Sequence, residues 1–302
     1  MLGVKKLFCN QKRQRFATIF AVFSIFLALL AAAIIHSLDW QYLADERKAS
    51  DFKPSAQVAA LADDLQLTRR GRAAFYATQP ELQDAGAFNT SCGRDGEATY
   101  TLGCYANDRI YLYNLDAETI DENGVYYDFA AEQKVTALHE FLHAAYSRLD
   151  AREQGTVCRE IKGVIATTPE LSKDLEYYTA DQFCTEGFAR IGSEYIGEIT
   201  LPAKLQAVYA RYFTPDYNLI ALGRQNKAQL AELSARTAKS RETLGVEKTR
   251  LDSSISAYRS SLTRRGYRAV SAQIAGYNAK VADYKALVAT YQKIAKVLDS
   301  ER

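Results

Sequence analysis

The segment His139-Glu140-Phe141-Leu142-His143 places two histidines four residues apart, with a glutamate beside the first. Residues four apart on a helix lie on one face, so both imidazoles can reach one ion. The glutamate then lies near that ion, where it can take a proton from a bound water molecule. The whole chain has three histidines, and two of them are in this segment. The pattern predicts a Zn²⁺ site with Glu140 as general base.

A catalytic zinc ion needs a third protein ligand and keeps a fourth position for water. The remaining histidine, His36, lies in an apolar run, so the candidates are acids. Asp150 lies seven residues past His143, but the metzincin pattern needs a glycine at three residues and a ligand at six, and these positions hold Tyr146 and Leu149. The better candidate is Glu186, on the resemblance described next. Two further acids are held in reserve: Asp181 and Glu194.

Around Glu186 the chain reads Thr185-Glu186-Gly187-Phe188-Ala189. With the HEFLH segment, it resembles the gluzincins, the thermolysin- and aminopeptidase-like zinc peptidases, in which a second helix supplies a glutamate ligand. The aminopeptidase branch has a local pattern similar to Asn-Glu-Gly-Phe-Ala. The resemblance covers roughly a third of the chain, and implies zinc bound by His139, His143 and Glu186 with Glu140 as the base. The chain departs from that branch in one respect: 42 residues separate His143 from Glu186, more than in the aminopeptidases, so an insertion is expected over 150–175.

Periodic apolar residues predict the helices that carry these groups. A stripe at steps of three and four residues runs along the predicted helix 130–149 and leaves His139 and His143 beside it, at the edge of a cleft. Another predicted helix, 174–197, carries Glu186 opposite its apolar stripe, and Gly187 is expected to allow close approach to the first helix. Alternation over 104–114 predicts one half-buried strand bordering the cleft. Shorter helices are expected at 56–65, 68–78, 153–170 and 202–213.

Four of the five cysteines follow residue 90. They allow three connectivities, and we favour the sequential one, Cys92–Cys104 and Cys158–Cys184. No CxxC spacing occurs, so zinc ligation by cysteine is not expected.

The N-terminus has the pattern of a membrane anchor. Five Lys or Arg residues and no acid precede residue 39, and the uncharged run 16–38 is long enough to span a bilayer. The charge bias predicts a cytoplasmic N-terminus and a single-pass cell-membrane protein with its catalytic domain outside. A cleaved signal peptide is the alternative.

The C-terminal region differs in charge and in period. Residues 224–302 carry 16 basic and seven acidic residues, a balance of +9, whereas residues 39–223 carry −12. Two heptad-like seams separated by Arg264-Arg265-Gly266 predict an antiparallel hairpin closed as a coiled coil, which projects and is not part of the catalytic core. One continuous helix that dimerises in parallel is the alternative. The basic surface is expected to face an anionic envelope polymer, lipid headgroups or the acidic catalytic domain, rather than nucleic acid.

The predicted fold class is therefore α+β, a mostly helical zincin-like catalytic domain with an N-terminal transmembrane helix and a C-terminal antiparallel helical hairpin. The expected regions are a basic segment, an anchor, a stalk, a peptidase-like domain and the hairpin, at 1–15, 16–38, 39–55, 56–223 and 224–302. The expected function is hydrolysis of peptide or protein substrates by water that zinc activates. The alternative is a surface scaffold or adhesion protein whose coiled coil does the binding and whose metal site is structural.

Overall fold

The computed structural model describes residues 39–92 and 102–298. The chain divides into two units, 1–44 and 45–302. In the first unit only residues 39–44 are described, and they include the start of helix α2, Trp40–Asp51. The second unit contains the HEFLH segment, the Glu186 segment and both long C-terminal helices, so the description below concerns that unit.

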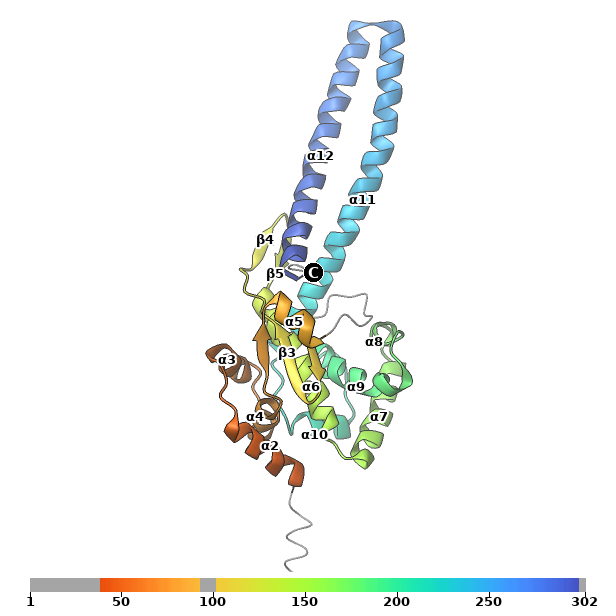
Figure 1. Cartoon of the computed structure of the whole chain (residues 1–302). Helices are drawn as coiled ribbons and strands as arrows, with labels where there is room; N and C mark the ends of the chain where they lie inside the picture. The colour runs from red at the N-terminus through yellow and green to blue at the C-terminus, as the bar shows by residue number, and fades with distance from the viewer. Residues whose placement is uncertain (1–38, 93–101, 299–302) are drawn as a thin grey trace, which may run out of the picture. The chain divides into compact units, whose positions relative to one another are not determined.

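The second unit is mostly helical, with two small sheets. Its elements up to the HEFLH helix are α3 Ala56–Asp64, α4 Arg69–Ala77, β1 Glu81–Gln83, α5 Ala85–Cys92, β2 Gly103–Ala106, β3 Arg109–Tyr113, β4 Ile120–Glu122, β5 Val125–Tyr127 and α6 Phe129–Ser147. Those that follow are α7 Ala151–Ala166, α8 Pro169–Asp174, α9 Ala180–Arg190, the π-helix η1 Ile191–Tyr195, α10 Ala203–Tyr209, α11 Tyr217–Ser261 and α12 Arg264–Leu298. Figure 1 shows their arrangement.

The membrane part of the predicted fold class needs correction. Within 39–92 and 102–298, no helix combines the length and the apolar character that crossing a bilayer requires. The run 16–38, on which the prediction rested, lies outside the described residues. We correct the fold class to a mostly helical protein with a long C-terminal helix pair, and the predicted location in the cell membrane is withdrawn with the anchor.

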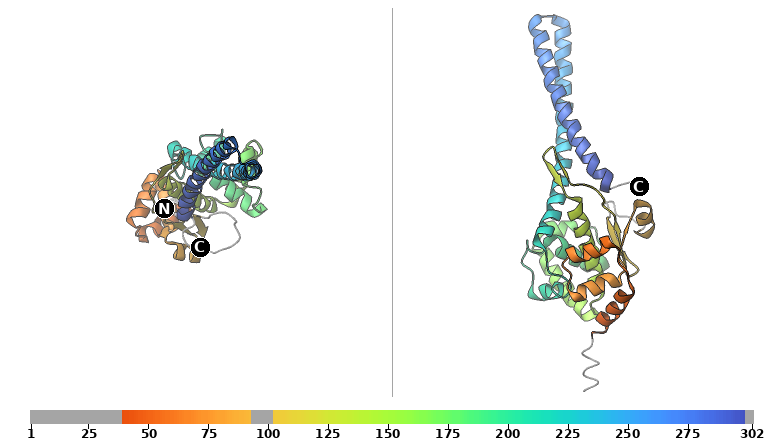
Figure 2. Two further views of the ribbon diagram at one scale, coloured as in Figure 1. Left: turned by 90° about the horizontal axis from the view of Figure 1, so that it is seen from above. Right: turned by 90° about the vertical axis from the view of Figure 1, so that its left-hand side faces the viewer.

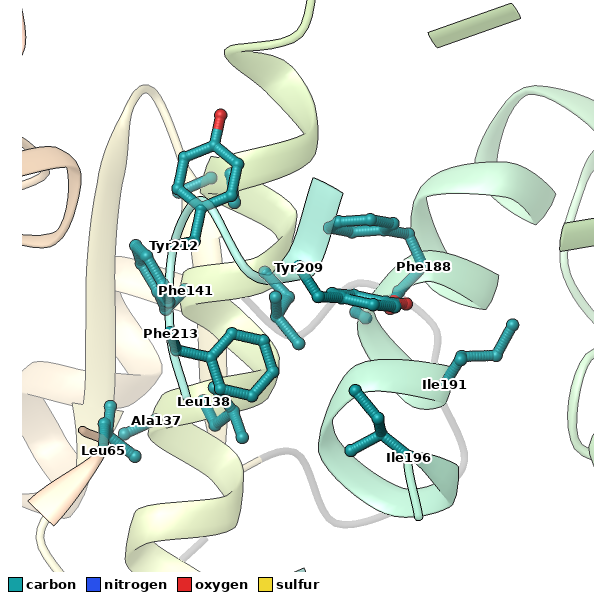
Figure 3. Packing of buried hydrophobic residues seen from close by; sticks show 14 of the residues in the cluster. Leu65, Ala137, Leu138, Phe141, Phe188, Ile191, Ile196, Tyr209, Tyr212 and Phe213 are labelled. Atoms are coloured by element: carbon teal, nitrogen blue, oxygen red, sulfur yellow. The ribbon is translucent and has the colours of Figure 1, made fainter. Parts of the chain in front are cut away.

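Helix α6 is the central element of the main hydrophobic core. Asp128 caps its first turn by accepting a hydrogen bond from the Ala131 N–H at 3.0 Å. Its apolar stripe packs against α3, α4, β3, α9 and η1, and Leu138, Phe141 and Leu142 are almost fully buried. Figure 3 shows Leu138 and Phe141 among the surrounding side chains. The helix predicted over 130–149 is confirmed.

The strand predicted over 104–114 is two strands. β2 and β3 form an antiparallel hairpin around Asn107-Asp108, and both turn residues have positive φ. That is the conformation of a two-residue hairpin turn in which Asn and Asp are favoured. β1 pairs in parallel with the other side of β3, so the order is β1-β3-β2 and β2 is an edge of the described sheet.

Helix α9 lies between α6 and α7, and both of its faces are buried as a result. A Cβ atom on Gly187 would lie 2.7 Å from Cγ2 of Ile161, so this glycine allows close packing against α7. The expectation that Gly187 allows close approach to the HEFLH helix is wrong. Disulfides join Cys158 to Cys184 and Cys92 to Cys104. The predicted sequential pairing is confirmed.

Helices α11 and α12 run side by side as an antiparallel pair (Figures 1 and 2). The chain reverses at Leu262, which has a φ of 47°, whereas Gly266 lies inside α12. The end of the pair away from this turn, around Leu233, Ile294 and Leu298, is its base. These three residues form a second buried cluster with Tyr127 and Phe129 of the domain. The expectation of a hairpin that stands apart from the catalytic core is therefore wrong for its base.

Asn226 joins this base to the HEFLH helix, and it is 1% exposed. Its Oδ1 accepts from the Asp128 N–H at 2.9 Å, and its Nδ2 donates to the Asp128 carbonyl at 2.7 Å and to Glu132 at 3.1 Å.

We predict that Asn226→Ala lowers the free energy of unfolding by about 1–3 kcal/mol, because it leaves buried polar groups unpaired. Urea denaturation measures this loss. The matched change Asn278→Ala, at an exposed position of α12, should stay within about 0.5 kcal/mol of the parent, and equal effects at both sites would contradict the role of Asn226.

Candidate metal centre

The side chains of His139, His143 and Glu186 converge between α6 and α9. Their ligand atoms lie within 4.8 Å of one another and could hold a metal ion. The two Nε2 atoms are 3.1 Å apart. Oε1 of Glu186 is 3.6 Å from Nε2 of His139, and Oε2 is 3.3 Å from Nε2 of His143. The two residues of the HEFLH segment and the glutamate of the second segment thus meet at one point.

These separations fit a small ion with nitrogen and oxygen ligands. A tetrahedral zinc ion bound at about 2.0–2.1 Å holds its ligand atoms about 3.3–3.4 Å apart. The two Nε2 atoms lie near that separation, and Glu186 brings a different carboxylate oxygen close to each of them. The side chains of His139 and His143 are 18% and 17% exposed, and that of Glu186 is 8% exposed. A metal ion at this position would therefore be held by the protein and still reachable from solvent.

Hydroxyl groups orient both imidazole rings. Oγ of Ser193 lies 3.4 Å from Nδ1 of His139 and donates its own hydrogen to the Ala189 carbonyl at 2.9 Å. When a metal ion takes the Nε2 lone pair, the serine oxygen can accept from Nδ1–H. Oγ1 of Thr185 lies 3.2 Å from Nδ1 of His143 in the corresponding place. Outer partners of this kind fix which ring nitrogen faces the ion.

The π-helix η1 places Ser193 beside His139. The Ile196 N–H donates to the Ile191 carbonyl at 2.8 Å, which adds one residue to the turn after α9. Short π segments of this kind are frequent at functional sites. A Cβ atom on Gly192 would lie 2.5 Å from Cδ1 of Leu142. Within the segment that carries Glu186, Gly192 rather than Gly187 therefore allows close approach to the HEFLH helix.

Glu186 is a buried carboxylate that the site keeps ionised. Burial acts to raise its pKa, but hydrogen bonds and electrostatic attraction from His139 and His143 outweigh burial and hold the pKa well below its ordinary value. Nε of Arg190 also donates to Oε1 of Glu186 at 2.7 Å. Burial lowers the pKa of Arg190, but Glu194 and Glu186 raise it above its ordinary value, so the guanidinium stays charged.

Glu140 is 7% exposed and lies against the edge strand β2. A Cβ atom on Gly103 of β2 would lie 2.7 Å from Cγ of Glu140 and 2.8 Å from Cγ2 of Thr136. The strand can lie this close because residue 103 has no side chain. The glutamate of the HEFLH segment is thus enclosed between its own helix and β2.

The alternative third ligands lie elsewhere. Asp150 caps α7 by accepting from the Arg152 and Glu153 N–H groups, and Asp181 is exposed in the first turn of α9. Glu194 pairs with Arg190 at 3.2 Å and with Lys227 at 3.0 Å.

The sequence did not lead us to the partners of the three ligands, which are Ser193, Thr185 and Arg190. Of these partners, only Arg190 could have been predicted from the sequence, because it lies four residues after Glu186 and residues four apart share one face of a helix.

Comparison with known proteins adds no family to these observations: no family model, no curated protein and no solved structure matches this chain.

We predict that the purified protein binds about one zinc ion per chain. His139→Ala and His143→Ala should abolish this binding. Glu186→Ala should weaken it by more than the roughly 10–100-fold that loss of an outer partner costs. Asp150→Ala is the control, since it removes a helix cap and leaves the three ligands in place. Metal analysis and competition with a chromophoric chelator measure these changes, and full zinc affinity in either histidine variant would refute the site.

Proposed function

We propose that this chain is a zinc-dependent metallopeptidase of the gluzincin type, which hydrolyses peptide or protein substrates. The observation that carries the proposal is the convergence of His139, His143 and Glu186, with Glu140 beside them on α6. Two of these groups come from the HEFLH segment and one from a helix that follows it, which is the arrangement that the resemblance implies.

The number and exposure of the ligands favour a catalytic site over a structural one. Structural zinc sites use four protein ligands, whereas catalytic sites use three and leave one position open. Among the described residues, three side chains converge here, and both imidazoles are partly exposed. Zinc, when bound, supplies Lewis acidity that polarises a carbonyl and lowers the pKa of water.

Glu140 is our candidate for the general base. A structural metal site has no use for a carboxylate at this position of the motif, but hydrolysis needs a group that takes a proton from water and delivers it to the leaving amine. Burial against Gly103 restricts the side chain of Glu140. A group restricted in this way loses little freedom when it acts, because its orientation is fixed in advance.

The edge strand β2 supports a peptide as substrate. Extended peptides bind to sheet edges through backbone hydrogen bonds, and β2 is an edge strand of the described sheet. Its Gly103 contacts Glu140, so a peptide added alongside β2 would bring its backbone to the proposed base. The hollow of about 380 Å³ lined by Glu46, Arg69 and Tyr76 shares no residue with the metal centre, and we give it no part in the reaction.

A second candidate function is a scaffold or adhesion protein that uses the helix pair and keeps the metal for structure. The observation that favours it is the charge around the turn at Leu262. Four exposed arginines lie there, and no carboxylate in the described part of the chain forms an ion pair with them: Arg259, Arg264, Arg265 and Arg268. In this candidate the basic surface binds an anionic polymer.

Glu140→Gln separates the two functions. If Glu140 is the base, the variant should retain its zinc and lose peptide hydrolysis by about 10²–10⁴-fold, because amide and carboxylate have nearly the same shape and only the carboxylate takes a proton. The measurement is cleavage of a general peptide library by zinc-loaded protein, with zinc content determined on the same samples. Equal hydrolysis by parent and variant would exclude Glu140 as the base. A zinc-loaded parent that cleaves no member of the library would favour the scaffold.

A further inference from the structure

We infer that Arg190 and Lys227 are positioning residues for the metal centre, and that they couple the base of the long helix pair to the ligand Glu186. The inference rests on the proposed metal centre and adds to it a structural role for the helix pair. Its elements are Glu186, Arg190, Glu194, Asp174 and Lys227, which we call the Glu186–Lys227 network.

The network begins at the ligand itself. Nε of Arg190 donates to Oε1 of Glu186 at 2.7 Å, and the side chain of Arg190 is 20% exposed. Nη1 of Arg190 lies 3.2 Å from Oε1 of Glu194, and Nη2 donates to the Tyr178 hydroxyl at 3.3 Å. A planar guanidinium held at several of its donors has a fixed orientation. Arg190 can therefore fix the carboxylate of Glu186 in the rotamer that faces the histidines.

The network ends on helix α11. Nζ of Lys227 lies 2.6 Å from Oδ2 of Asp174 and 3.0 Å from Oε2 of Glu194. The two oxygens of Glu194 thus bind two different cations, Arg190 from α9 and Lys227 from α11. The Tyr195 hydroxyl also donates to Oδ2 of Asp174 at 3.2 Å. Lys227 therefore holds in place the carboxylate that holds Arg190.

Helix α11 is a firm support for Lys227. The neighbouring Asn226 is buried and bonded to the backbone of Asp128 at the start of α6. One turn earlier, a Cβ atom on Gly223 would lie 2.6 Å from Cγ2 of Val135 on α6. The base of the helix pair is thus packed on the same helix that carries both histidines. The three helices are thus connected: α11 packs on α6, Lys227 of α11 is linked through Glu194 to Arg190 of α9, and Arg190 holds Glu186 beside the histidines of α6.

Charge alone predicts the opposite effect from positioning. The network contains two cations and three carboxylates, Glu186 included. Removing Arg190 or Lys227 makes the surroundings more negative, which on electrostatic grounds favours a bound cation. Loss of a residue that orients a ligand weakens metal binding instead, typically by about 10–100-fold. The sign of the change in zinc affinity therefore decides between the two accounts.

The experiment compares zinc dissociation constants by chelator competition for the parent, Arg190→Gln, Lys227→Met and the double variant. We expect Arg190→Gln to bind zinc about 10–100-fold more weakly, and Lys227→Met several-fold more weakly. Because Lys227 acts through Arg190, the double variant should be no weaker than Arg190→Gln alone. Arg190→Lys keeps the charge without the planar group, so it should not restore the parent affinity.

Lys293→Met is the matched control. Lys293 lies on the other helix of the pair, its side chain is 58% exposed against 53% for Lys227, and its Nζ is 2.6 Å from a carboxylate of Glu122, outside the network. This variant should bind zinc as the parent does. Thermal unfolding of the metal-free proteins checks that each variant is folded. If Arg190→Gln does not fold, Lys227→Met, at the more exposed position, carries the test.

Unchanged or tighter zinc binding in folded Arg190→Gln or Lys227→Met would overturn the inference while leaving the metal centre intact. Equal weakening in Lys293→Met would also overturn it, because the effect would then come from any loss of an ion pair at the base of the helix pair. A parent protein that binds no zinc would overturn the metal centre itself, and this inference with it.

Discussion

The architecture depends on one constraint: a carboxylate from α9 must stay ionised in a buried place, next to two imidazoles from α6. A buried charge without partners is costly, so it must be paired and hydrogen-bonded. Glu186 meets this need through His139, His143 and Arg190, and the carboxylate atoms come within 3.3–3.6 Å of the two imidazole Nε2 atoms. The constraint then extends outward, because each partner needs a fixed position of its own.

The backbone supplies those positions at two glycines and a π turn. Gly187 lets α9 pack on α7, where the Cys158–Cys184 disulfide ties the two helices together two residues before the ligand. Gly192 lets η1 pack on Leu142 and brings Ser193 to His139. A helix packed on both sides presents its glutamate inward even though its apolar stripe faces the other way. This explains why Glu186, which lies opposite the stripe, is buried rather than solvated.

Local patterns were enough to predict part of this from the sequence. Steps of three and four residues predicted α6, and the HEFLH spacing predicted its metal-binding face. Glu186 came from a resemblance, because nothing local relates it to α6. Lys227 could not be predicted, since its role depends on where α11 packs. Asn107-Asp108 is a turn signal that was present and overlooked, and Leu262 is a turn position that the sequence disfavours, because leucine rarely adopts a positive φ.

The most direct test of the account is X-ray absorption spectroscopy of the zinc-loaded protein, which reports the ligand atoms themselves. A centre formed by His139, His143 and Glu186 predicts nitrogen and oxygen ligands at about 2.0–2.1 Å, with the scattering pattern of two imidazoles. A shell of sulfur atoms at about 2.3 Å, or an oxygen shell without imidazole scattering, would contradict the central claim, because the ion would then be bound somewhere else.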